Sequence, residues 1–337
     1  MTNHPPGRVL VTGGAGFIGV NSVALLVAEG HQVLVVDDLR HDCGVPLPPE
    51  VDLEVADLGS PGLDAVFKRF RPDAVLHLAA QGGVSRSVRD PVGDAIVNVA
   101  GTIAALKATA DAGCRRFVFA SSGGAIYGSA RQLPTGERTA PRPLSPYGAA
   151  KLAAEGYLGT FARSFGLSTL ALRYANVYGP LQDGTGEAGV VAITCQRLLS
   201  GQPPEIRGDG RQTRDFVYVG DVARANLLAL RDPVEGVINI GTGQATSVRE
   251  VVDRLAQLAG YRGGIHFVDG RPGEVRHTAL SIGRAGHRLG WTPGTPLHDG
   301  LAQTLISFRQ RQAMAPATGA PAEAGARPGL GRPAGSE

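Results

Sequence analysis

The sequence has few cysteines, no long apolar run and no cluster of basic residues. Its three cysteines, Cys43, Cys114 and Cys195, lie far apart and form no Cys-x-x-Cys unit. This spacing argues against a disulfide scaffold or a zinc site, so we predict no bound metal and a reducing, cytoplasmic compartment. No stretch approaches the roughly 18 apolar residues of a membrane span. The first residues show no charged-then-apolar signal pattern, so we expect no membrane partner.

The charged residues are nearly balanced and are spread along the chain. Lys and Arg number 33 against 30 Asp and Glu, a formal net charge of +3. Because nucleic-acid binding needs a basic patch or stripe, we expect no nucleic-acid partner. With 337 residues, of which 43% are hydrophobic, the chain is long enough for two domains, or for one large domain with an appended lobe.

Short apolar runs alternate with helical patterns in the first half of the chain. Runs rich in β-branched residues, typical of strands buried on both faces, stand at 8–11, 33–36, 74–78, 117–120 and 169–172. Between them, residues 17–29, 92–112 and 147–165 show helical periodicity. Strands alternating with helices favour right-handed crossovers and a parallel sheet. We therefore predict an α/β fold, a Rossmann-type doubly wound parallel sheet.

The pattern changes near residue 175, where Gly and Pro begin to interrupt shorter elements. We predict a sheet domain over 1–175 and a smaller substrate-binding lobe over 176–312, with the strand at 237–240 returning to the sheet. Of the last 25 residues, 17 are Ala, Gly or Pro. Such a segment buries too little apolar surface to offset its ordering entropy, so we predict that residues 313–337 are disordered.

A glycine-rich turn separates the first strand from the first helix. Gly13 allows the tight turn, Gly16 allows a pyrophosphate to approach the backbone, and Gly19 allows close packing of helix on sheet. The N–H groups at the helix start then favour bound phosphate. Asp37 and Asp38 end the next strand, where a carboxylate accepts hydrogen bonds from ribose hydroxyls and repels a 2′-phosphate. The turn therefore predicts a dinucleotide site that prefers NAD to NADP.

A second motif begins a later helix. Ser145 is a good N-cap and Pro146 suits the first helical position. Tyr147 and Lys151 then lie four residues apart on one face of the helix. A nearby ammonium favours the phenolate and lowers the pKa of a tyrosine, so we predict that Tyr147 acts as a general base.

Together these motifs resemble the extended short-chain dehydrogenase/reductases, and within them the UDP-glucose 4-epimerase group of nucleotide-sugar epimerases. The resemblance covers roughly residues 8 to 310. Its motifs are Gly13-x-x-Gly16-x-x-Gly19, Asp57-Leu58, His77-Leu78-Ala79-Ala80, Tyr147-x-x-x-Lys151 and the run from Arg173 to Pro180.

The resemblance implies an NAD site and names its residues. Asp57 and Leu58 would flank the adenine, and Lys151 would hold the nicotinamide ribose. We interpret His77 as structural. The predicted cofactor-binding residues are Gly13, Gly16, Phe17, Ile18, Gly19, Asp37, Asp38, Asp57, Leu58, Leu78, Ala79, Ala80, Asn98, Tyr147, Lys151 and Tyr174.

The family's third catalytic group is a Ser or Thr shortly before a Tyr-Gly pair. Counting back from Tyr127, the usual hydroxyl position falls on Gly123, which is a departure from the pattern. We predict that the adjacent Ser122 is the catalytic hydroxyl, with Ser121 as the alternative. The dehydratase relatives carry an acidic pair after that hydroxyl, and Gly123-Gly124 supplies no carboxylate, so dehydration is disfavoured.

The resemblance also implies substrate-binding residues. Asn176 would contact the nucleotide-sugar, with Ser122 at the sugar, and the guanidinium groups of Arg214 and Arg271 would bind the pyrophosphate bidentately. Thr278 stands where some epimerases carry a bulky Tyr against the carbon-2 substituent, so a Thr there leaves room for an N-acetyl group. We interpret Asp215 and Asp221 as structural.

The implied activity is NAD-dependent 4-epimerisation of a nucleotide-sugar, UDP-linked by resemblance, through a transient 4-keto sugar. The alternatives are another reaction on a nucleotide-sugar, by a decarboxylase, reductase or dehydratase, or a catalytically silent NAD-binding sensor. By resemblance we also expect a homodimer. The nucleotide, the sugar and the pathway stay open at this point.

Overall fold

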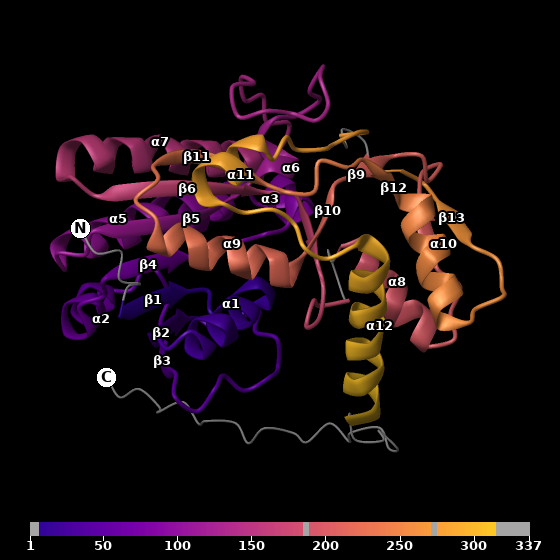
Figure 1. The fold of residues 1–337 in the computed structure, drawn as a ribbon, viewed down its shortest axis with the longest axis horizontal. Helices are drawn as coiled ribbons and strands as arrows, with labels where there is room; N and C mark the ends of the chain where they lie inside the picture. Colours follow the sequence, from indigo (N-terminus) through magenta and orange to yellow (C-terminus); the bar gives the residue numbers. More distant parts are fainter. Residues whose placement is uncertain (1–6, 185–188, 271–274, 315–337) are drawn as a thin grey trace, which may run out of the picture.

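A seven-stranded parallel sheet forms the centre of the computed structural model, which describes residues 7–184, 189–270 and 275–314. The strand order is β11-β6-β5-β4-β1-β2-β3 (Figure 1). The strands are β1 (Arg8–Thr12), β2 (Gln32–Asp37), β3 (Asp52–Val55), β4 (Ala74–His77), β5 (Arg116–Ser122), β6 (Ser168–Tyr174) and β11 (Gly236–Ile240). The order reverses between β1 and β4, so their carboxyl ends border the crevice where doubly wound sheets bind ligands. The predicted Rossmann-type fold is confirmed.

Helices cover both faces of this sheet. One layer contains α1 (Phe17–Ala28), α9 (Val219–Arg231) and α11 (Gly283–Leu289). The other contains α2 (Leu63–Phe70), α5 (Gly101–Asp111) and α7 (Pro146–Phe165). Alternate residues of β1 feed the two layers, since Val9 and Val11 belong to the first core and Leu10 to the second. A strand that is apolar at every position is thus buried on both faces.

The predicted helix over 92–112 is divided into three helical segments. They are α4 (Pro91–Ala95), a π-helical turn η1 (Ile96–Ala100) and α5. The Asp90 side chain caps α4 by accepting a hydrogen bond from the N–H of Gly93. A short helix, α3 (Val84–Arg89), precedes it. Because π-helical turns widen the hydrogen-bond spacing and are frequent at functional sites, Asn98 within η1 merits comparison with the site described below.

The second half of the chain builds a smaller lobe of short paired strands and helices, seen on the right of Figure 1. Its core includes Tyr178, Val191, Leu255 and Leu301. The paired strands are β7 (Asn176–Tyr178) with β10 (Phe216–Tyr218), β9 (Thr213–Arg214) with β12 (Thr246–Ser247), and β8 (Glu205–Arg207) with β13 (His266–Val268). The helices are α8 (Val190–Leu199), α10 (Val248–Ala259) and α12 (Leu297–Met314). Strand β11 and helices α9 and α11 return to the main sheet, so the chain crosses between the two parts more than once.

Helix α12 connects the lobe to the glycine-rich turn. A guanidinium nitrogen of Arg311 donates to the carbonyl of Cys43 at 3.0 Å, and the N–H of Cys43 donates to the carbonyl of Ala15 at 3.0 Å. The neighbouring Gln312 reaches the carbonyl of Leu199 at the end of α8, at 3.4 Å. Helix α12 therefore contacts the lobe directly and is linked to the glycine-rich turn through Cys43.

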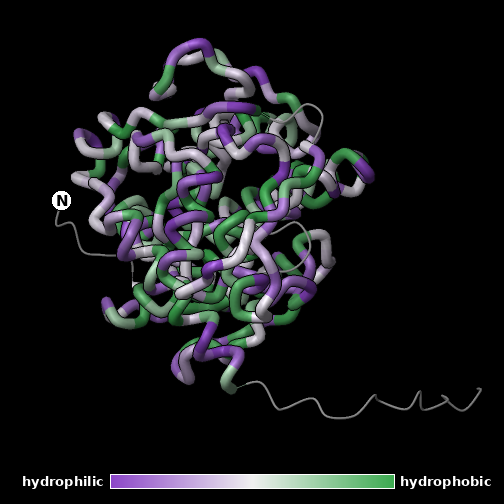
Figure 2. The backbone as a smooth tube through the Cα atoms, turned by 90° about the vertical axis from the view of Figure 1, so that its right-hand side faces the viewer, coloured by the Kyte–Doolittle hydropathy of each residue, from purple (hydrophilic) through white to green (hydrophobic). Residues whose placement is uncertain are grey.

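Hydrophobic and hydrophilic stretches alternate along the chain (Figure 2). Among the described residues, no helix combines the length and the apolar character that crossing a membrane requires.

Candidate active site

The glycine-rich turn lies at the carboxyl end of β1 and is pressed against the end of β4. Gly13 has a φ of +70°, and a Cβ there would fall 2.5 Å from the backbone nitrogen of Ala79. A Cβ on Gly19 would fall 2.2 Å from the carbonyl oxygen of Gly13. At Gly16, by contrast, the nearest atom would be 3.4 Å away. The turn is thus packed on the side of the sheet and open at Gly16.

No side chain caps α1, which begins at Phe17 after the extended residue Gly16. The N–H groups of Phe17, Ile18 and Gly19 are therefore the first turn of an uncapped helix, the arrangement that favours a bound phosphate. With the open face at Gly16, this cradle has the shape and the donors that the pyrophosphate of a dinucleotide requires.

Acidic side chains follow β2. The carboxylate of Asp37 accepts hydrogen bonds from the N–H groups of Ala15 at 3.0 Å and Leu39 at 2.9 Å. Arg40 joins Asp38 to Asp57, its Nε lying 2.7 Å from Asp38 Oδ2. Partial burial raises the pKa of Asp38, but hydrogen bonds from the Arg40 backbone and side chain outweigh it, so the pKa is lowered. Asp38 thus stays ionised at neutral pH.

The loop after β4 completes this side of the site. The N–H of Leu78 donates to the carbonyl of Thr12 at 3.0 Å, and the N–H of Ala79 lies 3.4 Å from the Thr12 hydroxyl. Ala80 follows in the same loop, half-buried. Leu58 is buried and would lie 3.2 Å from a Cβ on Gly101. These residues form an apolar wall beside the glycine turn.

His77 lies below this loop and is fully buried. Its Nδ1 lies 2.7 Å from the Thr12 hydroxyl and its Nε2 3.1 Å from the Thr102 hydroxyl. Burial, assisted by the charge of Lys151, lowers its pKa to about 3. The imidazole is therefore neutral and joins β1 to α5, which agrees with the structural interpretation.

Three predicted catalytic side chains meet where β5 ends and α7 begins. Ser122 ends β5 and precedes the short helix α6 (Gly123–Ile126). The Ser145 hydroxyl caps α7 by accepting from the N–H of Gly148 at 3.2 Å. This cap places Tyr147 in the first turn, where the Ser122 side chain is close enough to lower the pKa of the phenol.

Lys151 lies one turn further along α7 and is buried. Its Nζ donates to the carbonyl of Ala120 at 2.9 Å and lies 4.6 Å from the centroid of the Phe119 ring. The distance from Nζ to the centroid of the Tyr147 ring is 5.8 Å. The ammonium is therefore beside the tyrosine ring and anchored to β5.

The prediction that the Tyr147 pKa is lowered is wrong. Burial raises the pKa of Tyr147 to about 12, against a smaller lowering by the Ser122 hydrogen bond, and the negative charge of Asp94 raises it further. Burial also lowers the pKa of Lys151 to about 8. The physical reason is burial. The sequence shows the spacing of Tyr147 and Lys151, but it does not show that both groups are withdrawn from water. Withdrawal from water disfavours the phenolate and the ammonium alike.

The two serines at the end of β5 have different partners. The Ser121 hydroxyl donates to Glu155 at 2.6 Å, and Glu155 is also paired with the buried Arg173. Ser122, on the opposite face of the strand, lies beside Tyr147 and lowers the pKa of its phenol. The glycine at position 123 also has a packing reason, since a Cβ there would fall 2.4 Å from Leu280 Cδ1.

Two predicted cofactor residues are buried with their polar groups in use. Asn98 accepts from the N–H of Gln81 and donates to the Gln81 carbonyl, both at 3.0 Å. It also donates to Asp94 at 2.9 Å. Tyr174 donates its hydroxyl to Asn226 at 2.6 Å in the core beneath α1. A cofactor contact from Tyr174 would therefore have to come from its main chain.

Sequence reasoning overlooked Asp94. Its carboxylate is buried next to Asn98 and acts electrostatically on both Tyr147 and Lys151. The available signal was its position four residues before Asn98 in a helical pattern, which places both on one face. That spacing alone does not tell a buried acid from a solvated one.

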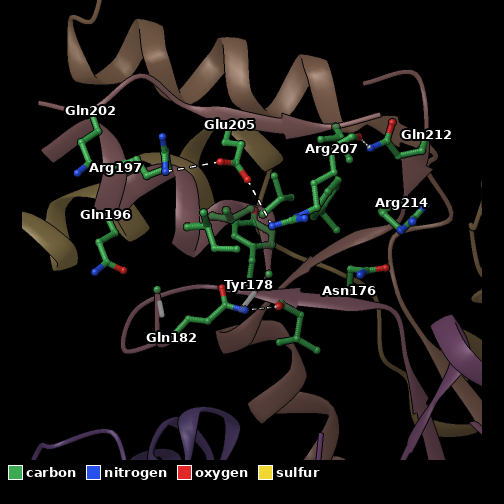
Figure 3. Close-up of a pocket in the computed structure, with 18 of the residues that line it drawn as sticks. Asn176, Tyr178, Gln182, Gln196, Arg197, Gln202, Glu205, Arg207, Gln212 and Arg214 are labelled. Carbon is green, nitrogen blue, oxygen red and sulfur yellow. Dashed lines mark hydrogen bonds and ion pairs between the residues drawn. The ribbon is translucent and has the colours of Figure 1, made fainter. Parts of the chain in front are cut away.

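A cavity of about 590 Å³ opens in the smaller lobe, and the predicted substrate residues Asn176 and Arg214 line it (Figure 3). One guanidinium nitrogen of Arg214 donates to the carbonyls of Thr213 at 2.9 Å and Arg276 at 3.2 Å. The further polar side chains in the lining include Gln182, Gln196, Arg197, Gln202, Glu205, Arg207 and Gln212. Such a polar cavity, of the volume of a small-molecule site, suits a nucleotide better than an apolar ligand.

The structure describes only part of the remaining residues that were assigned to the substrate lobe. Thr278 is nearly buried, and its N–H donates to the carbonyl of Thr213 at 3.2 Å. Its hydroxyl has no hydrogen-bond partner within 7–184, 189–270 and 275–314. Arg271 lies outside the described residues. Asp215 is fully buried and accepts hydrogen bonds from Thr242, Gly243 and Leu280, and Asp221 accepts from the N–H groups of Gly294 and Thr295; these contacts agree with the structural interpretation.

Comparison with known proteins decides the family. Residues 9–241 match the NAD dependent epimerase/dehydratase family. The chain belongs to this family. A putative UDP-glucose 4-epimerase of Methanocaldococcus jannaschii is 43% identical over 297 residues, covering 88% of this chain and 97% of that protein. The predicted resemblance to UDP-glucose 4-epimerases, the prediction of an enzyme, and NAD as its cofactor are thereby confirmed.

Solved structures agree with this assignment. The UDP-glucose 4-epimerase of Thermotoga maritima, determined with UDP-glucose, superposes with a TM-score of 0.89 at 43% identity, covering 90% of this chain and 99% of that one. The UDP-glucose 4-epimerase of Thermus thermophilus, determined with NAD, gives 0.85 at 43% identity over the same shares. Similarity at this level spans the whole of each relative rather than one domain.

Proposed function

We propose that this enzyme catalyses NAD-dependent 4-epimerisation of a UDP-linked hexose, UDP-glucose/UDP-galactose or the N-acetylated pair. One observation carries the proposal: Ser122 and Lys151 lie beside Tyr147 at the carboxyl edge of a sheet that carries a dinucleotide cradle. The polar cavity at Asn176 and Arg214 supplies room for a nucleotide. The similarity to epimerases determined with UDP-glucose and with NAD supports the choice of uridine and of this reaction.

The reaction divides between the side chains and the cofactor. Tyr147 in its phenolate form takes the proton of the 4-hydroxyl, while Ser122 donates a hydrogen bond to the same oxygen. Lys151 in its protonated form stabilises the phenolate. Bound NAD supplies the acceptor for the hydride of carbon 4 and the donor that returns it to the opposite face of the transient 4-keto sugar. Tyr147 then gives its proton back to the oxygen, so no other reactant is consumed.

Asn176 and Arg214 hold the substrate's nucleotide part while the sugar reorients, with Arg271 proposed as a second pyrophosphate ligand. Gly124 leaves room for that movement, because a Cβ there would meet nothing closer than Asn176 Oδ1 at 3.7 Å and Ser122 Oγ at 4.0 Å. Binding energy from the remote nucleotide retains the ketone between the two hydride transfers. We assign the cofactor to residues 1–175 and the nucleotide-sugar to residues 176–312.

We further propose a homodimer that pairs the α4–α7 face of two copies. Val88, Val92 and Ile96 are spaced four residues apart and are more than half exposed, and Phe165 of the adjacent α7 is exposed as well. Exposed apolar side chains at the spacing of Val88, Val92 and Ile96 mark an interaction surface. Light scattering after gel filtration should give the dimer mass for the native chain, and the monomer mass for Val92→Asp. A native monomer at micromolar concentration would reject this part of the proposal.

The activity is tested with the purified protein and no added cofactor. UDP-galactose and, separately, UDP-N-acetylgalactosamine are incubated with it, and the nucleotide-sugars are resolved by chromatography. Appearance of the gluco epimer is the expected result, and it would also establish resident NAD. A folded sample that contains NAD but converts neither sugar would contradict the proposal and leave the enzyme with another nucleotide-sugar or another reaction.

A further inference from the structure

The carboxylate of Asp94 is buried, and its two oxygens have unequal hydrogen bonding. The residue is 2% exposed, and its Oδ1 accepts from Gln81 Nε2 at 2.7 Å and from Asn98 Nδ2 at 2.9 Å. Its Oδ2 is buried and has no hydrogen-bond partner among the described residues. Burying an ionised oxygen without a partner is costly, so a compensating charge nearby would explain why the group is tolerated.

The compensating charge is that of Lys151, on the helix against which α4 packs. Asp94 lies on α4, and α4 and η1 pack against α7, which carries Tyr147 and Lys151. Lys151 is as deeply buried as Asp94, at 2% exposed. Burial is the main influence on Lys151 and lowers its pKa, and the charge of Asp94 is the largest influence in the opposite direction. Asp94 is therefore placed to oppose the loss of the lysine proton.

The other ionisable groups near Lys151 are already committed. Glu155, one turn along α7, also raises the Lys151 pKa, but its carboxylate is paired with Arg173 and accepts from Ser121. His77 on β4 is neutral at pH 7 because its pKa is about 3. Asp90, which raises the pKa of Asp94, is exposed on the surface at the start of α4. Asp94 is thus the nearby carboxylate without a cation of its own.

We propose that Asp94 is a positioning residue for the Tyr147–Lys151 pair, whose buried negative charge keeps Lys151 protonated beside the tyrosine. Asp94 Oδ1 accepts hydrogen bonds from Gln81 and Asn98, so the same carboxylate also orders the loop after β4. The catalytic meaning of this arrangement rests on the proposed function. The electrostatic part does not, because it concerns two groups of the protein alone.

The lysine content of the chain allows a direct test. The sequence has only three lysines, Lys68, Lys107 and Lys151, and the first two are exposed. In protein labelled with ¹³C at the lysine ε-carbon, each ammonium therefore titrates as a separate NMR signal. The variants Lys68→Arg and Lys107→Arg assign the surface signals, which leaves the third for Lys151.

The decisive variant is Asp94→Asn, which removes the charge and keeps an oxygen to accept from Gln81 and Asn98. We expect the Lys151 titration midpoint to fall by about 1 pH unit, since an opposite charge in a buried site shifts a pKa by roughly 1–3 units. The matched control is Asp90→Asn, which removes an exposed carboxylate from the same helix and leaves a good N-cap. It should leave the Lys151 midpoint unchanged.

The activity gives a second readout. Asp94 raises the pKa values of both Tyr147 and Lys151. Removing its charge should therefore move both flanks of the pH–kcat profile to lower pH, whereas a merely structural defect would lower the profile without moving it. If the native enzyme has no epimerase activity, the proposed function fails, and the NMR titration still tests the link between Asp94 and Lys151.

An Asp94→Asn protein with an unchanged Lys151 midpoint would overturn the proposal, as would an equal shift in Asp90→Asn. If Asp94→Asn does not fold, Asp94→Ser carries the same test, because it also removes the charge and offers a hydroxyl to the two amides. Asp94→Glu, which restores the charge, should return the midpoint towards the native value. A midpoint for Asp94→Glu equal to that of Asp94→Asn would also reject the proposal.

Discussion

The side chains of Ser122 and Tyr147 lie beside each other where the end of β5 meets the first turn of α7. Strand and helix are fixed independently, the strand by the sheet and the helix by its Ser145 cap. The proximity of the two side chains therefore follows from the backbone. Each hydroxyl can be removed on its own.

Tyr147→Phe removes the phenol oxygen and leaves the ring in place. We expect turnover to fall at least about 10²-fold, the usual contribution of a positioned acid–base group, with NAD still bound. Chromatography of the nucleotide-sugars measures turnover. The absorbance of the nucleotide released on denaturation measures the bound NAD. Turnover at the native rate would exclude Tyr147 as the base and assign the proton transfer to another group.

Ser122→Ala and Ser121→Ala separate the two serines. Ser122→Ala should reduce kcat about 10-fold or more and leave folding intact, because one hydrogen bond to the reacting oxygen is lost. Ser121→Ala should mainly reduce stability, since it leaves Glu155 with one partner fewer, by about 1 kcal/mol. Kinetics and urea unfolding of both variants check this. The reverse pattern would transfer the catalytic role to Ser121.

Placing a hydroxyl at the position usual for the family should not improve this enzyme. In Gly123→Ser the new Cβ would fall 2.4 Å from Leu280 Cδ1, and overpacking of this kind costs about 1–3 kcal/mol. The Leu280→Ala background should relieve most of that cost. Unfolding free energies of the two single variants and the double variant measure the coupling, and strictly additive losses would show that Leu280 is not the obstacle.

The buried His77 should make the protein sensitive to acid. Its pKa is about 3 in the folded chain against an ordinary value of 6.5. A base with a lowered folded-state pKa stabilises the fold above pH 6.5, and this contribution is lost as the pH falls from 6.5 towards 3. His77→Gln should be less stable at pH 7, with a flatter dependence of unfolding free energy on pH in that window. An identical pH slope in both proteins would contradict this origin of acid sensitivity.

Thr278→Tyr tests substrate size. The Thr278 side chain is small and nearly buried, at 9% exposed, so a tyrosine there would take up space that we assign to a carbon-2 substituent. We expect the ratio of UDP-N-acetylgalactosamine to UDP-galactose turnover to fall at least about 10-fold, as steric selection in a pocket commonly gives. Full activity of the variant on the N-acetylated sugar would remove Thr278 from the specificity assignment.

Local patterns predicted the sheet and the two ends of the site. Runs such as 33–36 are apolar at every position because the strand is covered on both faces. Gly13 and Gly19 leave no room for a Cβ, whereas Gly16 keeps one side of the turn open. The separation of Tyr147 and Lys151 follows from helical periodicity. These features leave a pattern of fixed local spacing, so one sequence was sufficient to find them.

Other features depend on contacts between distant segments. The glycine at position 123 is explained by Leu280, 157 positions further along the chain, and the state of Asp94 is explained by α7. The π-helical turn within 92–112 and the raised pKa of Tyr147 likewise follow from packing and burial. No periodicity within the local sequence contains that information.

The bond from Arg311 to Cys43, continued from Cys43 to Ala15, has a consequence for the order in which the protein is made. The ribosome releases the glycine turn among the first residues of the chain, and the helix that braces it among the last of those described. A nascent chain can close the sheet around β1 long before this brace exists. The nucleotide cradle therefore acquires this support only once α12 has been made and Arg311 reaches Cys43, 268 positions earlier in the chain.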